Sequence, residues 1–170
     1  RRSWLRSAAG GVAALSAASY LRAAGAGERL RVGVIGRTGH GDYGHSLDTV
    51  WLDVPETQLV AVADDSPAGL AEAAKRLNVT KAFADYREML EKEADKIDAV
   101  IVATPDHHHA PATMRAIRAG KHVYCEKPLT YNIYEARVIR EEAAKHKVAT
   151  QMGIQIHSGN NYRRVVELIQ

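Results

Sequence analysis

The feature that most constrains this sequence is a short apolar run followed by a cluster of glycines. Residues 30–36 are too few for a stable helix, and four glycines then occur within nine residues, at positions 36, 39, 41 and 44. This pattern is typical of a buried parallel strand that ends in a phosphate-binding turn. Glycine suits such a turn because a Cβ atom at the closest positions would hold a pyrophosphate away from the backbone N–H groups at a helix N-terminus. We therefore expect the rest of the chain to extend a nucleotide-binding sheet from this first strand.

Apolar runs alternate with helical patterns along the remaining sequence. Strands are predicted at residues 30–36, 59–63, 81–84, 99–103, 122–125 and 148–153, and helices at 44–52, 67–78, 86–93, 110–117 and 133–143. The strands are nearly all apolar, which is typical of a parallel sheet covered by helices on both faces. The sequence thus predicts an α/β fold, a doubly wound parallel sheet that binds a dinucleotide and has strand order 3-2-1-4-5-6.

The excess positive charge of the chain is confined to its first residues. The 170 residues include 23 lysines and arginines and 20 aspartates and glutamates, a net charge of +3. Four of the arginines and none of the acidic residues lie within residues 1–26, so residues 27–170 hold 19 basic and 20 acidic side chains, a net charge of −1. The charge balance therefore gives no reason to expect a nucleic-acid partner.

Residues 1–26 have the three-part layout of an export signal. Arg1 and Arg2 precede Trp4, a weakly apolar stretch follows at 8–21, and residues 24–26 form a small-x-small cleavage pattern. The paired arginines resemble a twin-arginine signal, which carries folded proteins to the periplasm. If the segment is instead an alanine-rich helix of the mature protein, we expect a cytoplasmic location. The apolar stretch is too short and too interrupted for a stable membrane span.

We expect three segments: the export signal at 1–26, a nucleotide-binding domain at 27–153 and the start of a second domain at 154–170. An amphipathic helix is predicted at 162–169 with nothing after it, which indicates a sequence truncated before the second domain. Cys125 is the only cysteine, so an internal disulfide is excluded. No base is evident beside it, and we expect a buried strand cysteine rather than a nucleophile.

The glycine cluster fits a dinucleotide fingerprint in two registers. The spacing Gly39-x-Gly41-x-x-Gly44 is literal, whereas Gly36-x-Thr38-x-x-Gly41 starts where the strand ends and has threonine in place of the middle glycine. We prefer the second register because the tight turn should begin at the strand end. The cofactor contacts predicted in this loop are Gly36, Arg37, Thr38, Gly39 and Gly41.

Two acidic residues, Asp64 and Asp65, follow the second predicted strand. A carboxylate at this point of a dinucleotide fold accepts hydrogen bonds from the adenosine ribose, so we assign Asp64 to the cofactor. No arginine or lysine is close in sequence to bind a 2′-phosphate, which favours NAD over NADP. The alternative role of Asp64, as the cap of the helix that begins at Pro67, suits Ser66 better.

A polar segment at residues 104–109 ends the fourth strand, beside the switch point of the sheet where ligands gather. Its three consecutive histidines point in different directions, whereas metal ligands on a helix are three or four residues apart, so we expect no metal site. Asp106 or His109 is expected to contact the nicotinamide side, and residues 107 and 108 to form a solvated helix start. The cofactor contacts predicted here are Thr104, Pro105, Asp106 and His109.

The most specific motif is Glu126-Lys127-Pro128, at the carboxyl end of the fifth strand. It places a cation at the mouth of the cofactor site. Lys127 can hold a substrate hydroxyl or carbonyl oxygen there and stabilise charge that develops on it during hydride transfer. Glu126 is expected to position that amine and to lie within reach of the cofactor. A surface ion pair alone does not account for the proline that follows at once.

Together these segments resemble the Gfo/Idh/MocA family, named after glucose–fructose oxidoreductase and inositol dehydrogenase. The resemblance rests on residues 32–36 with their glycine loop, 61–64, 103–106 with His109, and 119–129, while 151–153 and 162–164 resemble the family's passage into its second domain. It implies a Rossmann domain, NAD(P)-dependent oxidation or reduction of a sugar, cyclitol or polyol, and Lys127 as a catalytic-site residue. It also implies a second domain that carries a histidine or equivalent base and forms homo-oligomers.

Two other functions stay open. Some members of the family hold NAD tightly and use it transiently, so that a glycoside is cleaved with no net redox change. Cofactor that survives purification, with activity that needs no added NAD, favours that function. A non-catalytic NAD-binding module predicts binding without turnover. Residues 27–170 by themselves are expected to bind NAD weakly and to be inactive.

Overall fold

The computed structural model describes residues 29–44 and 46–170, so the export signal expected at 1–26 lies outside the described residues. Six strands form one parallel sheet: β1 (Leu30–Gly36), β2 (Thr57–Ala63), β3 (Lys81–Phe83), β4 (Ala99–Ala103), β5 (His122–Glu126) and β6 (Thr150–Gly153). Their order in the sheet is β3-β2-β1-β4-β5-β6. The predicted doubly wound α/β fold and strand order are confirmed.

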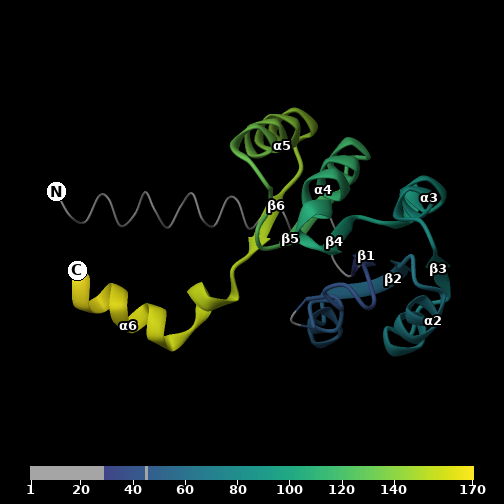
Figure 1. Ribbon diagram of the computed structural model, residues 1–170, viewed down its shortest axis with the longest axis horizontal. Coiled ribbons are helices and arrows are strands. Elements are labelled where there is room, and N and C mark those ends of the chain that lie inside the picture. Colours follow the sequence, from purple (N-terminus) through teal and green to yellow (C-terminus); the bar gives the residue numbers. More distant parts are fainter. Residues whose placement is uncertain (1–28, 45) are drawn as a thin grey trace.

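Helices cover both faces of this sheet (Figure 1). The α-helices are α2 (Pro67–Arg76), α3 (Tyr86–Lys92), α4 (His109–Arg118), α5 (Ile133–His146) and α6 (Asn160–Ile169). Short 3-10 helices occur at η1 (Val50–Asp53), η2 (Ala94–Lys96), η3 (Asp106–His108) and η4 (Gln155–Ser158). In Figure 1, α3, α4 and α5 lie on one side of the sheet and α2 lies on the other.

Side chains that alternate along the strands build a separate core on each face. Ile35, Val100 and Val102 belong to the cluster that packs against α3, α4 and α5. Val34 and Ile101 belong to the cluster on the opposite face, which includes residues of α2. Successive strand residues point to opposite faces, so a strand covered on both sides must be apolar at every position. All five residues of β4 are buried for this reason.

The helix predicted at residues 44–52 is wrong. The chain forms a series of turns after β1, and only the 3-10 helix η1 follows them. Asp42, Tyr43, Gly44 and Ser46 all have positive φ angles, between 44° and 62°. Left-handed backbone cannot continue into a right-handed α-helix, so this segment forms turns in which Leu47 is buried and Val50 is exposed.

The other helix starts follow local capping chemistry. Ser66 Oγ accepts a hydrogen bond from the Gly69 N–H, and Pro67 is the first residue of α2, as predicted. Asn132 Oδ1 caps α5 by accepting from the Glu135 N–H at 2.9 Å. These caps fix the residue at which each helix begins. They thereby set the length of the loop between the helix and the end of the preceding strand.

The last helix, α6, lies apart from the sheet and its covering helices (Figure 1). It is amphipathic, and its large apolar side chains are exposed, with Leu168 at 86% and Ile169 at 79%. Among the described residues, no helix combines the length and the apolar character that crossing a membrane requires.

Candidate functional site

The residues predicted to bind cofactor and substrate lie at the carboxyl ends of four neighbouring strands. Gly36 ends β1 and Glu126 ends β5, and the other predicted residues follow the strands directly, at 37–38 after β1, 64–65 after β2, 104–106 after β4 and 127 after β5. Because the strands are parallel, these ends meet at one edge of the sheet. A cavity of about 170 Å³ opens there, with Gly36, Arg37, Asp65 and Thr104 among its lining residues.

The glycine loop leaves room for a phosphate at two positions. Gly39 and Gly41 have φ angles of +80° and +89°, and a Cβ atom built on either one would meet no atom within 4 Å. Gly36 is small for a different reason, because its Cβ would lie 2.0 Å from the ring of Tyr43. An open, positive-φ backbone of this kind suits the close approach of a pyrophosphate, so the loop fits the cofactor that the sequence predicts.

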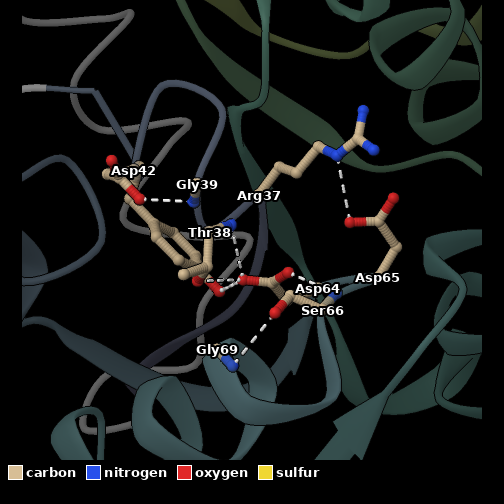
Figure 2. A network of polar contacts seen from close by, with 9 residues as sticks. Arg37, Thr38, Gly39, Asp42, Asp64, Asp65, Ser66 and Gly69 are labelled. Carbon is tan, nitrogen blue, oxygen red and sulfur yellow. Dashed lines mark hydrogen bonds and ion pairs between the residues drawn. The ribbon is translucent and has the colours of Figure 1, made fainter.

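One backbone N–H group of the glycine loop already donates a hydrogen bond to a carboxylate of the same loop. The Gly39 N–H donates to Asp42 Oδ1 at 2.6 Å (Figure 2). Asp42 was not among the predicted site residues, and only its positive φ and its place in the loop bring it over Gly39. A pyrophosphate that binds Gly39 must displace this negatively charged side chain.

Asp64 lies at the centre of a closed hydrogen-bond network (Figure 2). Its Oδ2 accepts from the Thr38 N–H at 2.9 Å, from Thr38 Oγ1 at 2.7 Å and from the Tyr43 hydroxyl at 2.7 Å. Its Oδ1 accepts from the Ser66 N–H at 2.9 Å, and the residue is only 1% exposed. Both carboxylate oxygens are thus engaged within the protein, and the assignment of Asp64 to the cofactor stays a prediction.

The protonation states of this network follow from its geometry. Burial alone raises the pKa of Asp64, but the hydrogen bonds from Thr38, Ser66 and Tyr43 outweigh burial and hold the pKa below its usual value. Burial, reinforced by the hydrogen bond to Asp64, raises the pKa of the Tyr43 phenol. Asp64 is thus a carboxylate at neutral pH, and Tyr43 is its hydroxyl donor.

Asp65 is exposed, whereas Asp64 is buried. The Asp65 side chain is 55% exposed and lines the cavity at the strand ends. Arg37 Nε lies 3.1 Å from Asp65 Oδ1 (Figure 2). No arginine or lysine is close to the acidic pair in sequence, but Arg37 is close to Asp65 in space, because β1 and β2 are neighbours and their ends bring the two side chains together.

His109 is buried rather than exposed to a cofactor. It is 0% exposed, with Nδ1 2.6 Å from the Pro128 carbonyl oxygen and Nε2 2.7 Å from the Thr104 carbonyl oxygen. It links the end of β4 to the segment that follows β5. The expected contact of His109 with nicotinamide is therefore not available in this conformation, and its effect on the site is to hold these two strand ends together.

The other residues of the polar segment after β4 are exposed to solvent or line the cavity at the strand ends. Asp106, His107 and His108 form the exposed η3. Partial burial, then the nearby His107 and Arg37, lower the pKa of His108, which lines the cavity. Thr104 Oγ1 is buried and has no hydrogen-bond partner in the described parts of the chain. Within those parts, no group of three or more His, Cys, Asp or Glu side chains is placed to hold a metal ion.

Glu126 and Lys127 are adjacent in sequence but differ in burial. Lys127 is exposed, whereas Glu126 is buried and its Oε1 lacks a hydrogen-bond partner within residues 29–44 and 46–170. No ion pair joins the two side chains there, so the expected positioning of the amine by Glu126 is not found. Cys125, just before them, is fully buried, and burial raises the pKa of its thiol to about 11, so it stays protonated at neutral pH.

An apolar cavity of about 290 Å³ beside Glu126 was not predicted from the sequence. Trp51 and Tyr124 line it, with their rings edge to face at 5.4 Å, and Leu47 and Val50 complete the apolar wall. The Trp51 indole Nε1 is also buried without a partner in the described chain. The segment that replaces the predicted helix at 44–52 forms this wall, which is why periodicity alone could not reveal it.

Comparison with known proteins agrees with this arrangement of strand ends and glycine loop. Residues 30–154 match the family model described as "Oxidoreductase family, NAD-binding Rossmann fold". The chain belongs to the Gfo/Idh/MocA family. The resemblance drawn from the sequence motifs is thereby confirmed, together with the NAD-binding Rossmann fold that it implies.

Curated relatives in the Gfo/Idh/MocA family include several inositol dehydrogenases. The chain is 30% identical over 141 residues to myo-inositol 2-dehydrogenase of Thermotoga maritima, covering 83% of this chain and 41% of the relative. It is 34% identical over 130 residues to inositol 2-dehydrogenase of Rubrobacter xylanophilus, covering 76% and 36%. The chain thus spans about two fifths of the length of these relatives.

Solved structures of the family have a similar fold. Scyllo-inositol dehydrogenase from Lactobacillus casei, with bound cofactor NAD(H) and scyllo-inositol, matches with a TM-score of 0.72 and 26% identity over 84% of this chain and 41% of that one. Myo-inositol 2-dehydrogenase from Lactobacillus plantarum matches with a TM-score of 0.73 and 26% identity over the same shares, 84% and 41%.

Proposed function

We propose that this chain is the cofactor domain of an NAD-dependent oxidoreductase that transfers hydride to or from a sugar, cyclitol or related polyol. The family and its inositol dehydrogenase relatives support this class of reaction and substrate. The observation that carries the proposal is Lys127, an exposed cation at the carboxyl end of β5, on the same sheet edge as the glycine loop. A cation there can act on a substrate oxygen beside a bound dinucleotide.

Each part of this edge has a separate task in the proposed reaction. The open backbone at Gly39 and Gly41 receives the pyrophosphate. NAD, when bound, supplies the nicotinamide ring that accepts or returns the hydride. The Lys127 ammonium group stabilises negative charge on the substrate oxygen as the carbon loses hydride. The hydroxyl proton passes to a base, which we place in the second domain.

The unpaired Glu126 carboxylate is the second residue assigned to the site. Its Oε1 is buried without a partner in the described chain, and a Cβ at Gly44 would lie 3.5 Å from its Cγ. A buried carboxylate oxygen left without a donor is costly unless a ligand supplies one. We assign Glu126 to a hydroxyl or amide donor of the bound cofactor or substrate near the glycine loop.

The test compares Lys127→Met with Lys75→Met in the full-length protein. Lys75 is exposed on α2, away from the strand ends, and serves as the matched control. With myo-inositol and NAD, followed by NADH absorbance, K127M should lower kcat about a hundredfold or more while NAD still binds, because only the developing charge loses its partner. Wild-type activity retained by K127M would overturn the role of Lys127, and NAD binding without turnover by the wild type would favour the non-catalytic module.

We further propose that residues 1–26 direct export and that the full-length protein forms a homo-oligomer through its second domain. Arg1 and Arg2, and the absence of acidic residues before Glu28, support the export proposal. Residues 1–26 fused to a folded reporter should carry it to the periplasm, and replacing both arginines with lysine should retain it in the cytoplasm. Sedimentation of the full-length protein tests the oligomer.

A further inference from the structure

We propose that His109 is a positioning residue for Lys127, and that its imidazole ring acts as a doubly protonated bridge between the carbonyl oxygens of Thr104 and Pro128. The inference rests on the proposed function, because it concerns how Lys127 is presented to the substrate. It gives a task to a titratable side chain that is 0% exposed at the edge of the sheet where the site lies.

The ring of His109 joins two segments that leave neighbouring strands. Nδ1 lies 2.6 Å from the Pro128 carbonyl oxygen, and Nε2 lies 2.7 Å from the Thr104 carbonyl oxygen. Thr104 directly follows β4, Pro128 comes shortly after the end of β5, and the two strands pair in parallel. His109 is itself the first residue of α4, so the ring starts from a fixed backbone. The bridge therefore ties the segment after β5 to the rigid part of the domain.

Lys127 lies between two fixed points of the backbone. Glu126, before it, is the last residue of β5 and pairs with Gly153 of β6. The Pro128 carbonyl group, after it, is held by His109. Because the Lys127 side chain is exposed, the place of its backbone sets where the amine can reach. A misplacement of about 1 Å can cost a reaction about a hundredfold in rate, so loosening the second fixed point should lower turnover.

The two contacts of the ring together require a proton on each nitrogen. A carbonyl oxygen only accepts hydrogen bonds, and a neutral imidazole has a single N–H group. A neutral ring can therefore donate to one of the two oxygens, and it turns a lone pair toward the other. An imidazolium donates from both nitrogens. With both nitrogens at hydrogen-bond distance from a carbonyl oxygen, the geometry fits the imidazolium.

The surroundings of His109 act on its second proton in opposite directions. Burial and the N-terminus of α4 oppose a positive charge, whereas the two carbonyl oxygens favour it. α4 packs against β4, β5, η3, α3 and α5. The titratable and charged side chains at this end of those elements are Cys125 and Glu126 on β5, Lys127 after it, Asp106, His107 and His108 on η3, Tyr86 and Arg87 on α3, and Glu135 on α5. Of these, Cys125 and Glu126 are buried, and burial keeps the Cys125 thiol neutral.

The test uses two amides that each keep one half of the bridge. The amide nitrogen of asparagine stands close to the place of Nδ1 and that of glutamine close to the place of Nε2, so His109→Asn can donate to Pro128 and His109→Gln only to Thr104. In the full-length protein with myo-inositol and NAD, H109Q should lower kcat about tenfold and H109N less than about threefold. Both should leave KM for NAD within about twofold of the wild type, because the glycine loop is unchanged.

The matched control is His146→Gln, which should leave kcat and KM unchanged. His146 lies in the last turn of α5 beside Glu142, at the end of that helix that leads into β6. Thermal melts of each variant establish that the full-length protein is folded before the assays.

Combining H109Q with Lys127→Met separates positioning from a general structural effect. If His109 acts through Lys127, H109Q should lower the residual kcat of K127M by less than about twofold. A loss as large in K127M as in the wild type would overturn the inference. Equal kcat values for H109N and H109Q would overturn it as well, because the Pro128 contact would then make no difference.

Nitrogen-15 NMR of the wild type measures the protonation of the ring without relying on any variant. In full-length protein labelled at histidine, in mildly acidic buffer, one ring should show two protonated nitrogens whose protons exchange slowly with water, because His109 is 0% exposed whereas His107 and His108 are exposed. A slowly exchanging ring with a single N–H group would overturn the bridge.

The outcomes keep this inference apart from the proposed function. If the wild type binds NAD without turnover, the proposed function fails, and the NMR measurement still decides the bridge. If the wild type turns over and K127M does not, the proposed function stands, and wild-type kcat in H109Q then overturns this inference alone.

Discussion

Thr38 and Asp64 are joined by two hydrogen bonds, from the Thr38 N–H at 2.9 Å and from Thr38 Oγ1 at 2.7 Å, both to Asp64 Oδ2. They lie 26 residues apart in sequence, on loops that leave neighbouring strands. The threonine that stands where the fingerprint has its middle glycine therefore has a structural contact, and its predicted contact with the cofactor stays a prediction. It fixes the glycine loop to the end of β2 through an ionised, buried carboxylate.

Thr38→Val tests how much the hydrogen bond from Thr38 Oγ1 to Asp64 contributes to the stability of the protein. The change keeps the shape of the side chain but removes the hydroxyl that donates to a carboxylate, so the free energy of unfolding should fall by about 1.5–3 kcal/mol. Urea denaturation of the wild type and the variant measures the difference. Thr130→Val is the control, because Thr130 Oγ1 donates only to an exposed carbonyl oxygen at 3.1 Å. Equal losses for the two variants would contradict the importance of the Asp64 contact.

The two kinds of glycine in the loop should respond differently to alanine. A Cβ at Gly36 would lie 2.0 Å from the buried Tyr43 ring, so G36A should destabilise the protein by about 3 kcal/mol through overpacking. Gly39 has open space but a φ of +80°, so G39A should cost about 1–2 kcal/mol of backbone strain. Denaturant titrations rank the two, and a more severe loss in G39A would show that the Tyr43 ring moves aside readily.

Asp42→Asn should strengthen NAD binding. The amide oxygen can still accept from the Gly39 N–H, as Asp42 Oδ1 does at 2.6 Å, but the variant lacks the negative charge that opposes a pyrophosphate. We expect the dissociation constant for NAD to fall about threefold, consistent with a screened charge at a solvent-exposed loop. Calorimetric titration of the full-length protein checks this. Asp53→Asn, on η1, controls for the change in net charge.

Acid should weaken the interaction between Arg31 of β1 and Asp98, which directly precedes β4. Asp98 accepts from the Arg31 N–H, Nε and Nη2 at 2.7–2.9 Å, and these hydrogen bonds hold the pKa of its carboxyl below the usual value. A pKa lowered by folding adds stability that is present above the unfolded-state pKa of about 3.9 and is lost as pH falls through the folded-state pKa.

The measurement for this acid effect is urea denaturation of the wild type and Asp98→Asn between neutral pH and acid. The wild type should be more stable than D98N above the unfolded-state pKa, and the difference should shrink as the pH falls, because asparagine cannot be protonated there. A difference that stays constant through the acid range would show that Asp98 titrates alike in the folded and unfolded chains.

Local patterns were sufficient for most of the sheet and its helix starts. Val32, Val34 and Ile35 could be assigned to a strand because a parallel sheet covered on both faces needs apolar side chains at successive positions. Ser66 and Pro67 identified the start of α2 because capping depends only on neighbouring residues. The helix prediction at 44–52 was wrong because it relied on the helical spacing of Leu47, Val50 and Trp51. That spacing does not reveal the positive φ angles at the start of the segment.

The sequence by itself thus determined the family, the strand order and which residues stand at the strand ends, because parallel strands place their carboxyl ends on one edge. Tertiary structure decided what each side chain does there. It enclosed Asp64 among donors from three residues, Thr38, Tyr43 and Ser66, and left Asp65 exposed beside Arg37. It also buried His109 between two carbonyl oxygens. Acceptor capacity, charge pairing and burial depend on atoms contributed by neighbouring strands, and linear spacing does not contain those neighbours.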